Sequence, residues 1–438
     1  MASLGQVRMW LTPGMRVKRF ILVAVLGAVL ALAGVVGFFL WLGQEERQLI
    51  AEPIEALLVS EPWRLWGGWV SLLVVLFGLT LAANAVVWLN RSLLSNWMAK
   101  PRDAAAILHR RLSLSRGPRV VALGGGSGLS NLLRGLKLYS ANITAVVTAS
   151  DDGGSSGRLR TAFGMPAPGD LNDCLAALSD SESQVSRLLE YRFTRGDDLK
   201  GHTFGNIFIT TLTEVEGDFA EAIRALNRLL NISGAVYPVS AEPIHLYFTK
   251  RSGAVVNGES RVRELPGAVK GVTIEPKTAA LVPEVARAVA RAHLIVLGPG
   301  SLFTSTIPPL LVPGCREAIL NSSAKVVYVC NVMTEAGETD DFSAWDHVEV
   351  LRAYLGRYPD LVILNSSDIG EERLRRYQAE GAGVVAFDRA RFEAAGVEVV
   401  SLAIVGAGLF AQHDSARLAR WLIDYSKHSL KMWWQERP

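Results

Sequence analysis

The sequence predicts an α/β protein with a Rossmann-like, doubly wound and largely parallel sheet, a small β-rich insertion, and an N-terminal hairpin of two transmembrane helices. Two uncharged stretches, at about residues 20–43 and 65–90, each exceed the roughly 20 residues that a membrane-spanning helix needs. From residue 118 onward, short β-branched runs alternate with helical patterns, which is typical of a parallel sheet with right-handed crossovers. Several of these runs end in glycine-rich turns.

The composition indicates a folded chain. Of the 438 residues, 50% are hydrophobic, and 45 Lys and Arg against 42 Asp and Glu give a net charge of +3. This chain is too apolar and too evenly charged for disorder, and nucleic acid is not expected as a partner. Cys174, Cys315 and Cys330 form no Cys-x-x-Cys pair, which favours reduced thiols over a disulfide framework or structural zinc.

Residues 1–97 are predicted to form the transmembrane hairpin. Basic residues flank it on both sides, among them Arg8, Arg16, Lys18 and Arg19 before the first span and Arg91, Lys100 and Arg102 after the second. The segment between the spans is acidic, so the positive-inside rule predicts the inner (cytoplasmic) membrane, with both termini and the main domain in the cytoplasm. A buried soluble hairpin and a signal peptide are the alternatives. Residues 98–117 form a basic connector, which either rests on anionic lipid or is solvated.

The main domain, residues 118–438, begins with a predicted strand at 119–124 and a predicted helix at 129–137. Between them lies a glycine turn made of Gly124, Gly125, Gly126, Ser127 and Gly128. Glycines allow a phosphate to approach the backbone, and the amides and positive dipole end of the helix stabilise the anion. The spacing lacks the third glycine of the dinucleotide fingerprint and the Walker lysine. A nucleotide or another phosphate ester fits this turn, and a tight turn without ligand is the alternative.

A second polar cluster follows the predicted strand at 143–148. It consists of Asp151, Asp152, Gly153, Gly154, Ser155, Ser156 and Arg158. Asp151 and Asp152 could hold a hydrated magnesium ion as a cofactor or bond to a ribose, while Arg158 offsets phosphate charge. A purely local turn is the alternative. Next along the chain, Asp170 could cap a helix or face the ligand.

Later segments add further candidates. His202 and Asn206 are four residues apart in a predicted helix and could contact the ligand, although a hydrogen-bonded structural histidine is the alternative. Short β-rich runs at about 235–275 predict an antiparallel insertion. Gly298, Gly300 and Ser301 follow a predicted strand at 293–297 and form either a second ligand loop or a simple turn. Further strands are expected at 325–331, 361–367, 384–387 and 397–402, with helices at 282–291, 345–355 and 414 to about 427.

Several long strings in a fixed order resemble the YvcK group of CofD-like proteins, also called gluconeogenesis factors, over about residues 119–411. The strings are Gly124-Gly-Gly-Ser-Gly-Leu, Ser150-Asp-Asp-Gly-Gly-Ser-Ser-Gly-Arg-Leu-Arg, Pro168-Gly-Asp, Gly201-His-Thr-Phe-Gly-Asn, Gly298-Pro-Gly-Ser-Leu-Phe-Thr-Ser and Asn331-Val-Met-Thr-Glu-Ala-Gly-Glu-Thr. The resemblance implies a Rossmann-like domain that binds UDP-sugars, notably UDP-N-acetylglucosamine, and supports cell shape and envelope growth under gluconeogenic conditions. The similar CofD enzymes transfer 2-phospholactate from a guanylylated donor with magnesium.

The resemblance supports the turn 124–128, Asp151 and Asp152, the loop through Arg158, and residues 298–301 as ligand-facing. This chain also departs from the family pattern. Asn172 and Asp173 stand where the family has Arg and Asn, Glu335 and Ala336 replace Gln and Pro, and Phe303 and Pro309 replace Tyr and Asn. These departures leave open a different selectivity for the sugar.

Two classes of function follow. In the first, the domain is a membrane-tethered UDP-sugar sensor whose occupancy changes its affinity for an envelope-synthesis protein, without catalysis. In the second, the same pocket is a CofD-like, magnesium-dependent transferase of a phosphoryl-linked group. A homo-oligomer is compatible with either. No Ser-His-Asp arrangement is evident from the spacing, so hydrolase chemistry is a distant third.

Overall fold

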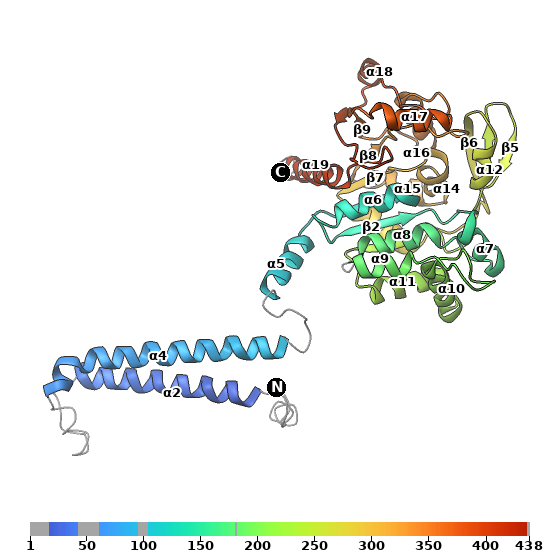
Figure 1. Cartoon of the computed structure of the whole chain (residues 1–438). Coiled ribbons are helices and arrows are strands. Elements are labelled where there is room, and N and C mark those ends of the chain that lie inside the picture. Colours follow the sequence, from blue (N-terminus) through green and yellow to red (C-terminus); the bar gives the residue numbers. More distant parts are fainter. Residues whose placement is uncertain (1–16, 43–60, 95–103, 180–181, 436–438) are drawn as a thin grey trace. The chain divides into compact units, whose positions relative to one another are not determined.

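The computed structural model describes residues 17–42, 61–94, 104–179 and 182–435, and it divides the chain into two compact units, residues 1–110 and 111–438 (Figure 1). The predicted basic connector is helical in its second part, as α5 (Ala104–Ser115). Most charged residues that flank the predicted spans, including Arg8, Arg16 and Lys100, lie outside the described residues. The membrane orientation based on them stays a prediction.

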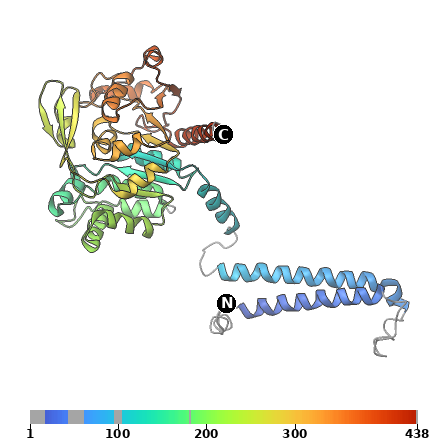
Figure 2. The same ribbon diagram turned by 180° about the vertical axis from the view of Figure 1, so that it is seen from behind.

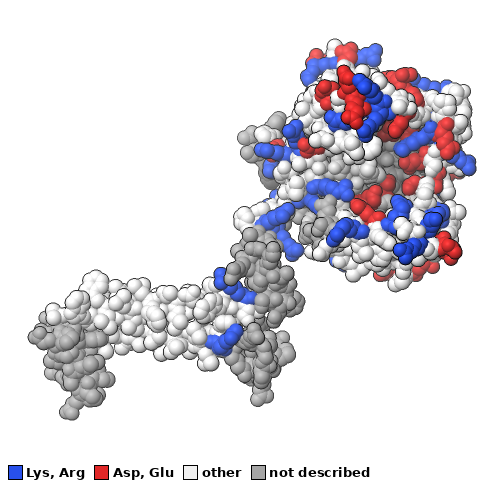
Figure 3. Space-filling view, in the orientation of Figure 1, with Lys and Arg blue, Asp and Glu red and all other residues white. Residues whose placement is uncertain are grey.

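The first unit contains two long apolar helices, α2 (Val17–Leu42) and α4 (Glu61–Leu94). Small residues line their contact: a Cβ added to Gly78 would lie 2.5 Å from the backbone nitrogen of Ala31. Large apolar side chains point outward instead, with Leu22 69%, Phe39 67% and Trp69 66% exposed. The face of this hairpin that is seen in Figure 3 is mostly white, and thus uncharged, between the residues drawn in grey. Both helices are long and apolar enough to cross a membrane, and only 17% of each apolar stretch is buried.

The second unit, hereafter the α/β unit, is built on a seven-stranded parallel sheet in the order β10-β9-β8-β7-β1-β2-β3. Its strands are β1 (Val120–Gly124), β2 (Ile143–Val147), β3 (Ala235–Pro238), β7 (Leu294–Leu297), β8 (Lys325–Val329), β9 (Leu361–Asn365) and β10 (Val399–Leu402). In the centre, Val120 of β1 is in register with Ile143 on one side and with Leu294 on the other. The strand order therefore reverses at β1, which confirms the predicted doubly wound sheet.

Helices cover both faces of the sheet, as Figures 1 and 2 show from opposite sides. The helices are α6 (Gly126–Leu136), α7 (Gly154–Phe163), α8 (Gly169–Leu178), α9 (Glu182–Leu189), α10 (Phe204–Glu216), α11 (Phe219–Leu229), α13 (Pro283–Ala290), α14 (Pro308–Leu311), α15 (Cys315–Leu320), α16 (Ala344–Leu355), α17 (Glu371–Ala379), α18 (Arg389–Ala394) and α19 (Ser415–Gln435), with a π-helical turn η2 (Leu302–Thr306).

Alternate residues of β1 face different cores. Val120 and Ala122 belong to the core that contains residues of α6, α8, α10, α11 and α19. Val121 and Leu123 belong to the core that contains residues of α13, α15 and α16. Because both faces are buried, the central strands are continuous apolar runs.

The predicted β-rich insertion is present but begins later than expected. It consists of β4 (His245–Lys250), β5 (Val255–Asn257), α12 (Glu259–Glu264) and β6 (Val269–Glu275), with antiparallel strands in the order β5-β4-β6. The run at 235–238, predicted to belong to the insertion, is instead β3, which pairs in parallel with β2 at the edge of the main sheet. Amino-acid composition does not distinguish an edge strand of the main sheet from a strand of the insertion, because both contain the same β-favouring residues.

Three local predictions are corrected. The helix predicted to contain His202 starts at Phe204, because Thr203 caps it by accepting a hydrogen bond from the amide of Asn206. Asp170 does not cap α8: Pro168 occupies the N-cap position, and Asp170 lies in the first turn. The strand predicted at 384–387 is reduced to an isolated bridge between Val384 and Met333.

Candidate functional site

The glycine turns after β1 and β7 meet at the carboxyl edge of the sheet. The two strands are adjacent and parallel, so their following turns lie at the same edge. A Cβ added to Gly128 would lie 2.5 Å from the carbonyl oxygen of Pro299, and one added to Gly300 would lie 3.5 Å from that of Gly125. The turns are therefore in direct backbone contact at the point where the strand order reverses, which is the usual ligand position in open α/β sheets.

A cavity of about 490 Å³ opens beside these turns. This volume lies within the range typical of small-molecule sites, about 300–1,000 Å³. The cavity combines backbone turns, carboxylates, an arginine and aromatic rings. Its lining residues are Gly125, Gly126, Ser127, Gly128, Asn131, Asp170, Glu259, Arg263, Pro299, Gly300, Ser301, Ser305, Asn331, Val332, Met333, Thr334, Glu335, Tyr377, Phe410, Ala411, Gln412 and His413.

The first glycine turn leads directly into α6, whose amino end faces the cavity. Gly126 has φ = +60°, a left-handed conformation that favours glycine, and Gly125 is the N-cap. The carboxylate of Asp170 accepts a hydrogen bond from the amide of Gly126, and burial together with the charge of Asp151 raises the pKa of Asp170 to about 7. An acidic group thus already contacts one of the amides that a phosphate would use.

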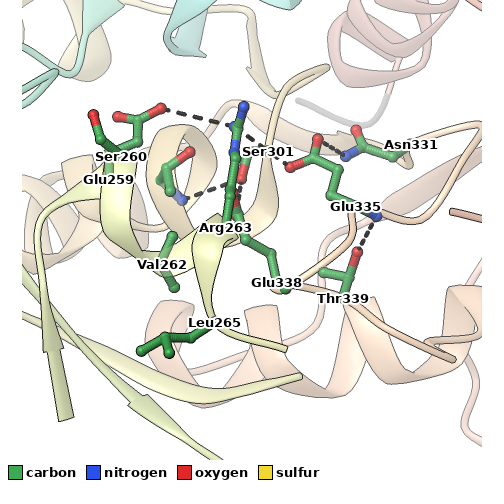
Figure 4. A network of polar contacts seen from close by, with 12 residues as sticks. Glu259, Ser260, Val262, Arg263, Leu265, Ser301, Asn331, Glu335, Glu338 and Thr339 are labelled. Carbon is green, nitrogen blue, oxygen red and sulfur yellow. Dashed lines mark hydrogen bonds and ion pairs between the residues drawn. The ribbon is translucent and has the colours of Figure 1, made fainter. Parts of the chain in front are cut away.

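Arg263 supplies positive charge from the insertion helix α12 (Figure 4). Its Nε donates to Oε1 of Glu338 at 2.8 Å, and its Nη2 lies 3.8 Å from both Oε1 of Glu259 and Oε2 of Glu335. The hydroxyl of Ser301, in the second turn, donates to Glu338. Burial raises the pKa of Glu259 well above its ordinary value, and the charges of nearby carboxylates add to this shift. The arginine therefore joins the insertion to the main sheet at the wall of the cavity.

Seven of the predicted site residues line this cavity together: Gly125, Gly126, Ser127, Gly128, Asp170, Gly300 and Ser301. Gly124 is the last residue of β1 and Gly298 follows the last residue of β7; each directly precedes a residue that lines the cavity. Asp151 accepts a hydrogen bond from the amide of Gly153 at 2.9 Å. Asp152 accepts hydrogen bonds from the amide and hydroxyl of Ser260, at 2.9 and 2.8 Å, and thereby anchors α12.

The rest of the second polar cluster forms an internal network beside the cavity. The hydroxyl of Ser155 lies 3.0 Å from Nδ1 of His202, and Nδ2 of Asn206 donates to Ser155 at 3.1 Å and to Ser156 at 3.4 Å. Gly153 is the N-cap of α7 and Gly154 is its first residue, and Arg158 donates to the carbonyl of Lys200 at 3.3 Å. Burial and nearby arginines lower the pKa of His202. These contacts match the structural alternative for His202, while a ligand role for this cluster stays a prediction.

The hydrogen bonds of Asp151 and Asp152 restrict how a magnesium ion could bind at these two predicted ligands. In the described part of the chain, no three Asp, Glu, His or Cys side chains gather closely enough to hold a metal ion. One oxygen of Asp152 is bound to Ser260, and one oxygen of Asp151 is bound to Gly153. Magnesium is often held by one or two carboxylates together with waters and substrate phosphates. An ion at Asp151 and Asp152 would fit only in that form.

Sequence reasoning missed several lining residues. Arg263 and Glu259 lie in the insertion, and no local pattern connects them with a turn of the main sheet. Asn331 follows β8 at the same edge as the glycine turns, so the alternation of strands and helices was a usable signal for it. His413 precedes α19, and burial lowers its pKa to about 4, so it is neutral at pH 7.

Comparison with known proteins gives consistent matches. The profile of the family described as "2-phospho-L-lactate transferase CofD" matches residues 120–405. A putative gluconeogenesis factor of Deinococcus radiodurans is 43% identical over 94% of this chain and 88% of its own length. The gluconeogenesis factor of Bacillus subtilis is 42% identical over 71% of this chain and 98% of its own length. A crystal structure of a Bacillus halodurans protein superposes with a TM-score of 0.69 at 39% identity, covering 70% of this chain and 100% of that one.

Proposed function

The chain belongs to the CofD family, with gluconeogenesis factors among its relatives, and from this membership we propose that its α/β unit binds a UDP-sugar of the UDP-N-acetylglucosamine type. The proposed role is that of a sensor: occupancy of the cavity changes the affinity for an envelope-synthesis protein and so supports cell shape under gluconeogenic growth. Such a switch requires only that the ligand binds two states of the protein with different affinities.

The observation that supports ligand binding most strongly is the contact between the two glycine turns at the cavity wall. The amino end of α6 and the turn at Gly300 border the position of a diphosphate from two sides, and Arg263 adds a cation; the amide of Gly300 donates a long hydrogen bond, 3.4 Å, to Asn331. Tyr377 and Phe410 line the same cavity and offer ring faces to a base or sugar. A nucleotide sugar has this combination of a charged diphosphate and flat or apolar parts.

A transferase is the second candidate, because the matching family is described by that activity. Asp151 lies close enough to Asp170 for its charge to raise the pKa of the latter. In this case Asp151 and Asp152 would hold magnesium, which would offset phosphate charge when bound. Arg158 would offset the remaining charge while an acceptor hydroxyl attacks the phosphoryl group in line; the bond from phosphorus to the nucleotide breaks, the nucleotide leaves as its phosphate, and the hydroxyl proton passes to water. The two candidates differ in whether the nucleotide sugar is consumed.

The test is a calorimetric titration of the full chain in lipid nanodiscs with UDP-N-acetylglucosamine, with and without magnesium, followed by recovery of the ligand. We expect saturable binding and recovery of unchanged ligand. Consumption of a nucleotide donor that is lost in Asp151→Asn would favour the transferase. Absence of binding in every condition would contradict the proposed function.

The contact between the turns yields a prediction for Gly128→Ala. The added Cβ would lie 2.5 Å from the oxygen and 2.9 Å from the carbonyl carbon of Pro299, both backbone atoms, so the two turns must move apart. We expect the affinity for UDP-N-acetylglucosamine to fall at least about tenfold, since 1.4 kcal/mol of lost contact suffices. Gly124→Ala is the matched control, because its Cβ would meet its nearest neighbour, Cβ of Leu129, at an ordinary 3.6 Å. Equal affinities of the two variants would contradict the argument.

The helical hairpin supports a proposed membrane tether. A soluble protein would cover the large outward-facing side chains of α2 and α4, whereas a bilayer solvates them. We expect both termini and the α/β unit in the cytoplasm. Reporters fused after Ala51 and after Pro438 should therefore give outside and inside signals, respectively. An outside signal from the reporter after Pro438 would contradict this orientation.

A further inference from the structure

Glu335 lies in the loop after β8 (Figure 4) and is one of the residues that line the cavity. Its Oε1 accepts a hydrogen bond from Nδ2 of Asn331 at 3.3 Å. Its Oε2 is buried and has no hydrogen-bond partner within the described ranges; Nη2 of Arg263 lies 3.8 Å away. The nearby hydroxyl of Ser301 donates its one hydrogen to Glu338. Oε2 of Glu335 therefore has an ion pair with Arg263 but no hydrogen-bond donor among the described residues, in a residue that lines the cavity.

The charge around the cavity opposes an anionic ligand. Asp170, Glu259 and Glu335 line the wall, and Arg263 is the one Lys or Arg among the described lining residues. That arginine is already bound to Glu338. If every carboxylate were ionised, a diphosphate would enter a wall of net negative charge in a partly desolvated site, where repulsion is strong. Binding would then require a proton or a cation to be taken up at the wall.

We propose that Glu335 contacts the phosphate-bearing ligand in its protonated form, so that the ligand binds with uptake of one proton at this side chain. The inference rests on the proposed function of the same cavity. In the acid form, the second oxygen becomes an O–H donor to a phosphate oxygen; in the ionised form, it repels the phosphate. The proton is assigned to Glu335 because its Oε2 has no hydrogen-bond donor in the described part of the chain, whereas Glu338 accepts hydrogen bonds from Arg263 and Ser301.

The surroundings of Glu335 place this protonation in the physiological range. Burial and the charge of Glu338 raise its pKa to about 7, and the charge of Arg263 opposes the shift only in part. Other titratable groups face it or share its cavity: Asp170 and Glu259 from α8 and α12, Tyr328 from β8, and His413 before α19. An anionic ligand raises the pKa of Glu335 further, so the affinity is highest below pH 7 and falls as pH rises, by up to about tenfold per pH unit for one proton.

The test compares wild type with Glu335→Gln, which replaces one carboxylate oxygen by a permanent N–H donor of the same shape. The full chain in nanodiscs is titrated calorimetrically with UDP-N-acetylglucosamine at pH 6, 7 and 8, in buffers of different ionisation enthalpy, which counts the protons taken up. Because Asp170 contributes its own pH dependence, the difference between the two proteins is the measured quantity. At pH 8 we expect the variant to take up close to one proton fewer and to bind about tenfold tighter than wild type, with similar affinities at pH 6. Glu393→Gln, at an exposed position of α18, should keep the wild-type profile.

Identical proton uptake and pH profiles for wild type and Glu335→Gln would overturn the inference and leave the proposed function intact. The same conclusion would follow if wild type binds at pH 8 without proton uptake, a result that depends on no variant. Absence of binding by all proteins at every pH would overturn the proposed function, and the inference with it.

Discussion

Replacing Lys250 with methionine is expected to lower the free energy of unfolding of the α/β unit by about 3–5 kcal/mol, because several buried carbonyls lose their donor and each unsatisfied group costs about 1–3 kcal/mol. Lys250 ends β4 and is only 1% exposed. Its ammonium donates to the carbonyls of Val262 at 2.8 Å, Leu265 at 2.7 Å and Gly267 at 2.9 Å, and to that of Gly337. These bonds join the insertion to the loop after β8, and methionine fills the space without satisfying any of the carbonyls.

Urea denaturation of the full chain, monitored by a probe in the α/β unit, measures this loss. Lys270→Met is the matched control, since Lys270 lies on β6 of the same insertion with its side chain exposed, and such surface changes usually stay within about 0.5 kcal/mol. A loss below about 1 kcal/mol for Lys250→Met, or equal losses for the two variants, would contradict the structural role of the buried ammonium.

Replacing Arg263 with methionine is expected to weaken binding of UDP-N-acetylglucosamine about 100-fold, because a charge-assisted contact worth about 3 kcal/mol is lost and 1.4 kcal/mol corresponds to a factor of ten. The same change leaves Glu338, whose side chain is 0% exposed, without its partner at 2.8 Å. The cavity wall then becomes more negative. Arg263→Lys keeps the charge but loses the planar fork, so an intermediate affinity is expected.

Arg261→Met provides the control for this variant. Arg261 lies on the same short helix, α12, but its side chain is exposed and does not line the cavity. Calorimetric affinities and thermal midpoints measured together separate a binding effect from unfolding. Unchanged affinity in a folded Arg263→Met protein would contradict the assignment of Arg263 to the ligand site.

The sheet and its glycine turns were predictable because their causes are local. β1 and β7 are apolar runs whose residues are buried on both faces, and each ends in glycines that permit a turn. The start of α10 could also have been predicted from the sequence, since Thr203 is a good N-cap residue. The edge strand β3 could not be assigned to the main sheet in this way, because only its pairing with β2 distinguishes it from the insertion strands.

The cavity wall was predictable only in part, because it depends on the folding back of the insertion. Asp152 was expected to face a ligand or a metal, yet its carboxylate binds Ser260 of α12. That contact and the buried Lys250 place Arg263 at the glycine turns, across a long separation in sequence. No spacing rule connects these residues, so only the tertiary structure reveals the cation and the carboxylates around it.

A structure of the chain bound to UDP-N-acetylglucosamine tests the central claim, that the two touching turns and Arg263 form one phosphate site, most directly. We predict diphosphate oxygens within hydrogen-bond distance of the amides of Ser127 and Gly128, of the turn at Gly300 and Ser301, and of the guanidinium of Arg263. A diphosphate bound instead at Gly153–Arg158, or anywhere remote from the turn at Gly128, would contradict the claim.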